Sequence, residues 1–221
     1  MNLAKYIDHT ILKAETTTEQ VEKIAKEAVE HSFFSVCVNS SYVPLVRSLV
    51  EGSTVRITSV IGFPLGAMST AAKVAETKDA IAAGADEIDM VIHLGMLKDG
   101  RYDAVREDIR QVKEACGNRL LKVIIESAAL TDEEIVRACK LSEEAGADFV
   151  KTSTGFHAAG GASEAAVALM RRTVGDRLGV KASGGIRDYD TAVRMVQSGA
   201  TRLGASASVD IVRGRAADTD Y

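Results

Sequence analysis

The amino-acid sequence predicts an α/β protein, a single-domain (β/α)8 or TIM barrel over residues 1–221. Short apolar runs alternate with longer segments of helical period, and the pattern repeats about eight times. Strict alternation of strand and helix indicates a parallel sheet. Eight units favour a closed barrel over an open, doubly wound sheet, which stays the alternative. The two prolines form no stiff linker that would divide the chain.

Eight strands are expected where apolar residues cluster between turn residues. Between these strands lie segments with the period of a helix. In chain order the strands are YIDHTIL (6–12), FFSVCV (33–38), VRITSVI (55–61), EIDMVI (87–92), LKVIIE (121–126), FVKTST (149–154), GVKAS (179–183) and RLGAS (202–206).

Three of the expected helices have clear periodicity or capping signals. The segment 131–145 begins with Thr131 as N-cap, and Glu134 completes a capping box. Segments 101–116 and 188–198 show the same periodicity, and Asp188 caps the second of them. A short helix is expected to begin near Val209.

A weak internal repeat places a glycine where three of the helices should stop. The repeat units are AAGADEIDM, EAGADFVKT and QSGATRLGA, with Gly84, Gly146 and Gly199 at the left-handed position. Five residues after each glycine stand Asp89, Lys151 and Gly204. If the units are equivalent, these three residues lie at one level and on one face of their strands.

Composition and charge exclude several classes of protein. Of the 221 residues, 46% are hydrophobic and 26% are charged, and the net charge of −4 comes with both signs spread along the chain. Without a basic stripe, nucleic acid is not expected as a partner. Any anionic substrate must therefore be bound by local groups.

The cysteines and the N-terminus indicate a soluble cytoplasmic protein. Three cysteines without CxxC spacing argue against a disulfide framework and against a zinc site. The N-terminal MNLAKYIDHT has no signal-peptide core, and no apolar run is long enough to span a membrane. We therefore expect no membrane partner and no metal.

Two lysines stand in consecutive strands with apolar residues before them, Lys151 in FVKTSTG and Lys181 in GVKASGG. Burial penalises an ammonium group, so such a lysine is expected to perform chemistry or to pair with an anion. Two neighbouring ammonium groups disfavour each other's charge, and one pKa should fall. A neutral lysine is a nucleophile towards carbonyls. The alternative is a pair of surface lysines whose side chains reach solvent from the strand ends.

Two further charged residues are expected inside the barrel. Asp89 supplies an ionisable group that can move protons during imine formation, unless it only pairs with a lysine. Lys122 is expected near the barrel floor, in an ion pair with Glu126 or Asp89.

Two glycine-containing loops are the expected phosphate site. SGGIR (183–187) follows the seventh strand and LGASAS (203–208) follows the eighth, where barrels often bind phosphate. Arg187 adds positive charge there, unless it is a solvated arginine. The other candidates in the two loops are Gly184, Gly185, Ile186, Gly204, Ala205 and Ser206.

At these motifs the sequence closely resembles the DeoC family, the class I deoxyribose-phosphate aldolases. The similarity covers essentially the whole chain, through IDHTILK, SVCV, VIGFPLGA, ADEIDMVI, LKVIIE, DFVKTSTGF, VKASGGIR and RLGAS. The resemblance implies reversible cleavage of 2-deoxy-D-ribose 5-phosphate to D-glyceraldehyde 3-phosphate and acetaldehyde, in deoxyribonucleotide catabolism. It implies a covalent lysine imine and no metal or organic cofactor.

The resemblance also assigns roles to residues of this chain. Lys151 corresponds to the lysine that forms the Schiff base, Lys181 to the lysine that lowers its pKa and helps to move protons, and Asp89 to the proton donor and acceptor. Asp8 matches an acid near the lysine pair, with a turn or cap residue as the alternative. Thr154 and Gly155 are expected to line the pocket.

The C-terminus and two substituted positions are further points of comparison with the family. Tyr221 ends a polar tail, about 214–221, that we expect to be mobile. In the family a terminal tyrosine folds over the site for proton transfer, and a frayed end is the alternative. Some relatives carry a lysine where this chain has Phe156 and a serine where it has Ala207, which predicts fewer phosphate contacts here.

The expected partners are a small sugar phosphate and an aldehyde, together with further copies of the chain. We expect a homo-oligomer, with a dimer through exposed barrel helices as the specific guess. Two other functions stay open on the sequence. One is a phosphosugar isomerase or epimerase that uses Asp89 as base and forms no imine. The other is a sugar-phosphate binding module without turnover.

Overall fold

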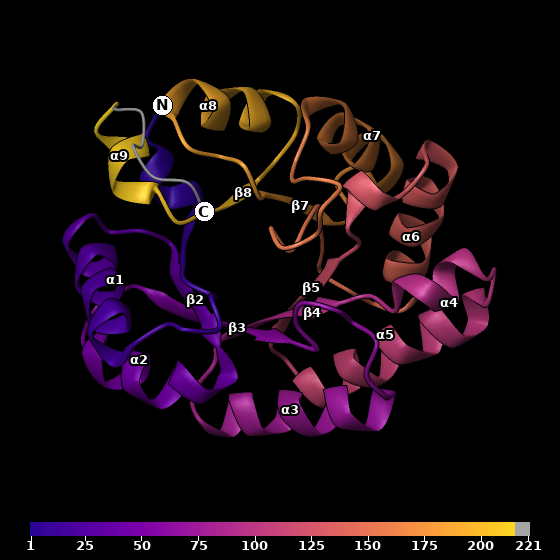
Figure 1. Ribbon diagram of the computed structural model, residues 1–221, viewed down its shortest axis with the longest axis horizontal. Coiled ribbons are helices and arrows are strands. Elements are labelled where there is room, and N and C mark those ends of the chain that lie inside the picture. The colour runs from indigo at the N-terminus through magenta and orange to yellow at the C-terminus, as the bar shows by residue number, and fades with distance from the viewer. Residues whose placement is uncertain (215–221) are drawn as a thin grey trace.

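The computed structural model describes residues 1–214 and contains a closed barrel of eight parallel strands, ordered as in the sequence. Helices surround the strands as an outer ring (Figure 1). The strands are β1 (Ile7–Thr10), β2 (Ser35–Asn39), β3 (Arg56–Ile61), β4 (Glu87–Val91), β5 (Leu120–Ile124), β6 (Phe149–Lys151), β7 (Gly179–Ser183) and β8 (Arg202–Ala205). The (β/α)8 prediction is confirmed.

The helices follow the strands in the expected alternation. They are α1 (Thr18–Glu30), α2 (Val43–Leu49), α3 (Thr70–Ala82), α4 (Leu94–Lys98), α5 (Tyr102–Cys116), α6 (Asp132–Glu144), α7 (Glu164–Val174), α8 (Tyr189–Gln197) and α9 (Ser208–Val212). Three short 3-10 helices add to them: η1 (Leu3–Tyr6), η2 (Ser40–Tyr42) and η3 (Ser127–Ala129). Residues 215–221, which include Tyr221, lie outside the described residues.

The capping signals read from the sequence determine where helices begin. At α6, Thr131 and Glu134 form both hydrogen bonds of the capping box. At α8, the carboxylate of Asp188 accepts from the backbone N–H of Thr191 at 2.8 Å. These contacts satisfy N–H groups that the first helical turn leaves unpaired.

The three repeat glycines adopt the left-handed backbone that the sequence predicts. Gly84, Gly146 and Gly199 have φ values of 114°, 83° and 113°. At these positions the chain leaves a helix and enters the next strand, where a side chain would be strained. The repeat therefore sets the start of β4, β6 and β8.

Strands β5 and β6 end earlier than the sequence predicts. Glu126 adopts a left-handed backbone, with φ 56° and ψ 56°, which breaks the extended run after Ile124. The N–H of Thr154 donates to the Glu126 carboxylate at 3.1 Å, not to a neighbouring strand. The last residues of both predicted strands thus form loops at the mouth of the barrel.

The apolar core lies between the strands and the helices. Outward-facing strand residues such as Val36, Ile88 and Val123 are fully buried there. The barrel interior, in contrast, holds polar and charged side chains. Within residues 1–214, none of the helices combines the length and apolar character that a membrane crossing requires.

Candidate active site

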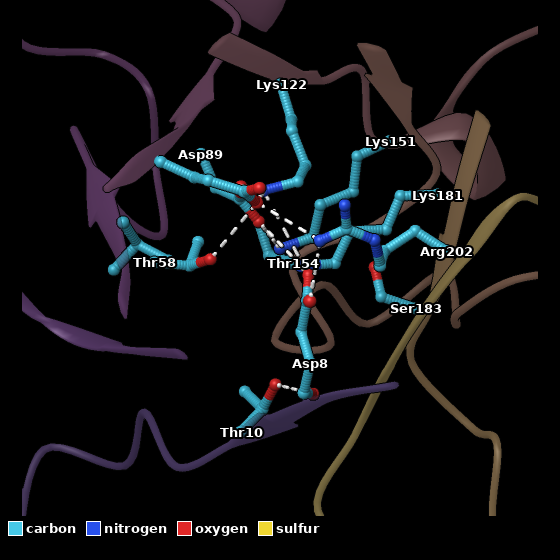
Figure 2. Close-up of polar contacts among 12 residues, drawn as sticks. Asp8, Thr10, Thr58, Asp89, Lys122, Lys151, Thr154, Lys181, Ser183 and Arg202 are labelled. Atoms are coloured by element: carbon cyan, nitrogen blue, oxygen red, sulfur yellow. Dashed lines mark hydrogen bonds and ion pairs between the residues drawn. The ribbon is translucent and has the colours of Figure 1, made fainter. Parts of the chain in front are cut away.

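Lys151 and Lys181 lie side by side inside the barrel, at register-paired positions on β6 and β7. Both ammonium groups donate to the same oxygen, Oδ2 of Asp89 on β4, at 2.9 Å each (Figure 2). Lys151 is 3% exposed and Lys181 is fully buried. The alternative of surface lysines is therefore wrong, and the structure brings together the three residues expected to carry the chemistry.

The other oxygen of Asp89 is held by a third lysine. Lys122 on β5 donates to Asp89 Oδ1 at 2.8 Å and to Glu87 Oε2 at 2.6 Å. The expected ion pair with Asp89 is confirmed. The alternative partner, Glu126, is wrong, because its left-handed backbone points its carboxylate to Thr154.

Asp8 on β1 extends the cluster on the far side of Lys181. Its Oδ2 accepts from Lys181, and its Oδ1 accepts from Arg202 at 2.9 Å and from Ser35 at 2.8 Å. Arg202 also donates to Glu87 at 3.1 Å. Asp8 therefore stands next to the lysine pair, and the alternative of a turn or cap residue is wrong.

These contacts form one buried charge cluster, which we define as Asp8, Glu87, Asp89, Lys122, Lys151, Lys181 and Arg202. The cluster contains three carboxylates and four cations from the described part of the chain. Its net charge is therefore +1 when all seven groups are ionised. Lys151 has a single carboxylate partner in the cluster, whereas Lys181 has two. Loss of the Lys151 proton would therefore neutralise the cluster.

The pKa values of the two lysines move in opposite directions. Burial lowers the pKa of Lys151, and the neighbouring Lys181 lowers it further, against the opposing effect of Asp89. Burial also disfavours the charge of Lys181, but the carboxylates of Asp8 and Asp89 outweigh it and raise that pKa. Repulsion between the lysines contributes as expected, although burial is the larger cause.

The carboxylate of Asp89 stays ionised in this setting. Burial by itself would raise its pKa, but Lys122, Lys151 and Lys181 together hold the pKa well below its usual value. An ionised carboxylate with an oxygen 2.9 Å from Lys151 is in place to accept protons from a reacting amine.

A cavity of about 250 Å³ opens over Lys151 at the carboxyl ends of the strands. All nine residues expected to bind substrate line it: Thr154, Gly155, Gly184, Gly185, Ile186, Arg187, Gly204, Ala205 and Ser206. Gly184 and Gly185 have φ values of 83° and 80°, which a residue with a side chain rarely adopts. The two glycine loops thus bring backbone atoms to the wall of the cavity above Lys151.

Comparison with known proteins identifies the family. The family model for DeoC/LacD family aldolases matches residues 2–217. The chain belongs to this aldolase family. A protein called deoxyribose-phosphate aldolase from Streptococcus suis is 60% identical over the full length of both chains. The relative of the same name from Macrococcus caseolyticus is 58% identical, also over both full lengths.

Solved structures agree with the family assignment. The deoxyribose phosphate aldolase from Aeropyrum pernix, described as having a unique tetrameric structure, is 34% identical with a TM-score of 0.89. The alignment covers 96% of this chain and 89% of that one. The aldolase therefore shares the barrel of its relatives across nearly all of its length.

The aldolase cavity also contains residues that the sequence analysis did not single out. Gly161 lies so close to Gly184 that an added Cβ would stand 2.3 Å from the Gly184 carbonyl oxygen. The N–H of Ala162 donates to that oxygen at 3.0 Å. The HAAGG run was the available signal for this second glycine loop. The other residues of the cavity wall that the sequence analysis did not single out are Thr10, Leu12, His157, Gly160 and Ser183.

Glu126 is a further site residue that sequence reasoning missed. Its buried carboxylate accepts from the hydroxyl of Thr154 at 2.6 Å as well as from the Thr154 N–H. A left-handed glutamate is uncommon and is typical of functional sites. The hydrogen bonds to Thr154 offset the strain of this left-handed backbone, and they fix Thr154 at the wall of the cavity.

The two positions that differ from some relatives have ordinary structural roles here. Phe156 stacks edge-on against Phe63, with ring centroids 5.3 Å apart. Ala207 is the N-cap of α9 and makes no side-chain capping hydrogen bond. Within residues 1–214, no group of three or more His, Cys, Asp or Glu side chains is arranged to hold a metal ion.

Proposed function

We propose that this aldolase reversibly cleaves 2-deoxy-D-ribose 5-phosphate to D-glyceraldehyde 3-phosphate and acetaldehyde through an imine on Lys151. The names of its relatives, up to 60% identical, support the substrate. The observation that carries the mechanism is a buried Lys151 at the cavity, paired with one carboxylate and next to a better paired Lys181.

The first step is attack of the neutral Lys151 amine on the aldehyde carbon C1 of the open-chain sugar. A C–N bond forms, the carbonyl π electrons move to oxygen, and the oxygen is protonated to give a carbinolamine. Loss of water then leaves the iminium ion. Asp89, 2.9 Å from Nζ of Lys151, accepts the amine proton, and Lys181 supplies the proton that departs with water.

In the second step the iminium ion draws electrons from the bond between C2 and C3. This bond breaks as the hydroxyl on C3 loses its proton, which releases the three-carbon aldehyde and leaves a two-carbon enamine on Lys151. Protonation of the enamine at C2 and hydrolysis of the imine return acetaldehyde and the free lysine. The iminium ion is the electron sink, so the reaction needs neither a metal nor an organic cofactor.

The remaining residues bind and position. We propose that Asp8 holds Lys181 charged, so that Lys151 and not Lys181 gives up its proton. The loops at Gly184, Gly185 and 204–206 receive the phosphate with backbone N–H groups, and Arg187 adds charge. A role for Tyr221 in proton transfer at the acetaldehyde carbon stays a prediction.

Reduction with borohydride in the presence of deoxyribose 5-phosphate tests this proposal. The expected result is a mass addition on the peptide that carries Lys151, and its loss in Lys151→Ala. The exposed Lys98, on α4, gives a matched control, since Lys98→Ala should retain the adduct. An adduct that survives Lys151→Ala contradicts the assignment. No adduct on any lysine, with solvent protons exchanged into an intact sugar phosphate, favours an isomerase.

We also propose that the chain forms a homo-oligomer in the cytoplasm. The tetrameric relative from Aeropyrum pernix supports self-association. A dimer through the barrel helices stays the specific prediction, and light scattering of the purified protein tests it.

A further inference from the structure

His9 lies outside the barrel interior, yet it is tied to a loop of the active-site cavity. It follows Asp8 on β1, so its side chain points to the opposite face, towards the helices. There Nδ1 stands 2.9 Å from Oγ of Ser208, and Nε2 stands 2.8 Å from Oε2 of Glu27. Ser208 Oγ also donates to the carbonyl oxygen of Ala205 at 2.9 Å. These contacts join α1, β1 and the turn between β8 and α9.

Counting protons fixes the state of the imidazole in this chain of contacts. A carbonyl oxygen only accepts, so the single hydroxyl proton of Ser208 goes to Ala205. Nδ1 of His9 must then donate to Ser208. An ionised Glu27 also only accepts, so Nε2 must donate as well. All three hydrogen bonds exist together only when both ring nitrogens carry a proton. The contact with His9 also lowers the pKa of Glu27, which keeps that carboxylate ionised.

The contacts that run from Glu27 through His9 and Ser208 to Ala205 are called the His9 relay below. The turn at Ala205 and Ser206, which this relay holds, has open space beside it. Ala205 and Ser206 line the active-site cavity. A second cavity of about 470 Å³ is lined by Ser206 and Ala207, and also by His9 and Glu27. Ser206 faces both cavities, so side-chain packing alone does not hold the turn. The hydrogen bond from the buried Ser208 to Ala205, with Ser208 held in turn by the buried His9, supplies the missing constraint.

We infer that His9 is a positioning residue whose doubly protonated ring, through Ser208, fixes the turn at Ala205 and Ser206 for binding of the substrate phosphate. This inference rests on the proposed function. A ring with a single donor could make only two of the three hydrogen bonds, so the relay uses both ring protons. Phosphate binding should therefore weaken when the contact between His9 and Ser208 is removed, while imine chemistry at Lys151 is unaffected by this relay.

Other charged and aromatic side chains surround the relay. On α1, Lys23 approaches Glu27 at 3.9 Å. Phe33 lies between His9 and His31, with ring centroids 5.2 Å and 5.6 Å from the two imidazoles. The second cavity brings three more charged side chains from the neighbouring segments: Lys13, Arg187 and Asp210.

The test compares substrates with and without phosphate in the full-length protein. For Ser208→Ala and His9→Phe we expect KM for deoxyribose 5-phosphate to rise about tenfold, as loss of a charge-assisted hydrogen bond predicts. kcat should stay within about twofold, since the relay does not touch Lys151. KM for unphosphorylated 2-deoxyribose should not change. His31→Asn, a histidine without a link to Ala205 in these contacts, is the matched control.

His9→Asn tests whether the hydrogen bond to Ser208 is what the turn requires. The amide can donate to Ser208, so KM for the phosphorylated substrate should stay near that of the wild type. A tenfold rise in KM with His9→Asn would overturn the inference, as would equal changes in KM for both substrates or no change with Ser208→Ala. Thermal melts check that each variant folds. Wild-type protein that forms no Lys151 adduct would contradict the proposed function instead.

Discussion

Lys151 and Lys181 donate to one and the same carboxylate oxygen, Oδ2 of Asp89, at equal distances of 2.9 Å. Lys181 has a second carboxylate in Asp8, and Lys151 does not. The shared oxygen makes the protonation of one lysine depend on the charge of the other. In the proposed mechanism these unequal partners decide that Lys151, and not Lys181, is the nucleophile.

Replacement of Lys181 by leucine should move the pH dependence of catalysis. The positive charge of Lys181 lowers the pKa of Lys151, so its removal raises that pKa. Because the neutral amine attacks, the rising limb of kcat/KM then lies at higher pH. At pH 7 each unit of increase costs about a factor of ten in activity. A pH–rate profile of Lys181→Leu checks this, with Lys98→Leu as control, and an unshifted limb contradicts the electrostatic argument.

The buried carboxylates of Asp8 and Asp89 should make the free energy of unfolding depend on pH in the acid range. Asp8 and Asp89 have pKa values below those of the unfolded chain, because lysine and arginine partners outweigh the cost of burial. Their contribution is present above the unfolded pKa, about 3.9, and is lost as the pH falls below it. The free energy of unfolding in urea should differ between pH 5 and pH 3 by about 1 kcal/mol for each such carboxylate. Asp8→Asn should reduce that difference, whereas Asp176→Asn, at an exposed position, should not.

Gly204 is expected to tolerate no side chain. An added Cβ would lie 3.1 Å from Cε of Lys181 and 3.0 Å from Cβ of Ser183. Gly204→Ala must therefore push Ser183 and the end of the Lys181 side chain outwards by a few tenths of an ångström, and we expect kcat to fall about tenfold with a lower melting temperature. Gly95→Ala is the control, since its nearest atom, Cε1 of His93, would be 3.7 Å away. Equal activity of the two variants would show that Lys181 has room to move.

Substitutions at Glu126 and Thr154 should have coupled effects on the free energy of unfolding. Glu126→Gln and Thr154→Val each remove hydrogen bonds between a buried carboxylate and the cavity wall, and each should destabilise the protein by about 1–3 kcal/mol. The double variant should cost less than the sum of the two single variants. Denaturant unfolding of all four proteins measures this coupling, and strict additivity would refute it.

The sequence predicted those features that depend on local chemistry. Gly84, Gly146 and Gly199 mark helix ends because only glycine accepts that backbone at low cost, and Thr131 with Glu134 begins α6 by its own hydrogen bonds. Strand order in a barrel follows the chain, so the adjacency of Lys151 and Lys181 also follows from their sequence motifs.

The partners that side chains find across the barrel could not be predicted from local sequence. The partners of Lys122 depend on strand stagger and on where β5 ends, and the left-handed backbone of Glu126 removed one of the two expected partners. Arg202, the first residue of β8, gives no sign in the sequence that it reaches Asp8 and Glu87. The His9 relay likewise joins residues 199 positions apart.

The buried charge cluster divides by sign along the chain. Its acids all come from the first four strands, at Asp8, Glu87 and Asp89, and its bases come from the last four. Each half-barrel on its own would hold charges of a single sign that repel one another and lack their partners. Half-barrel fragments of this protein should therefore not fold separately, and they should attract each other when mixed. The electrostatics that prepare one lysine for catalysis also bind the two halves of the chain into a single folding unit.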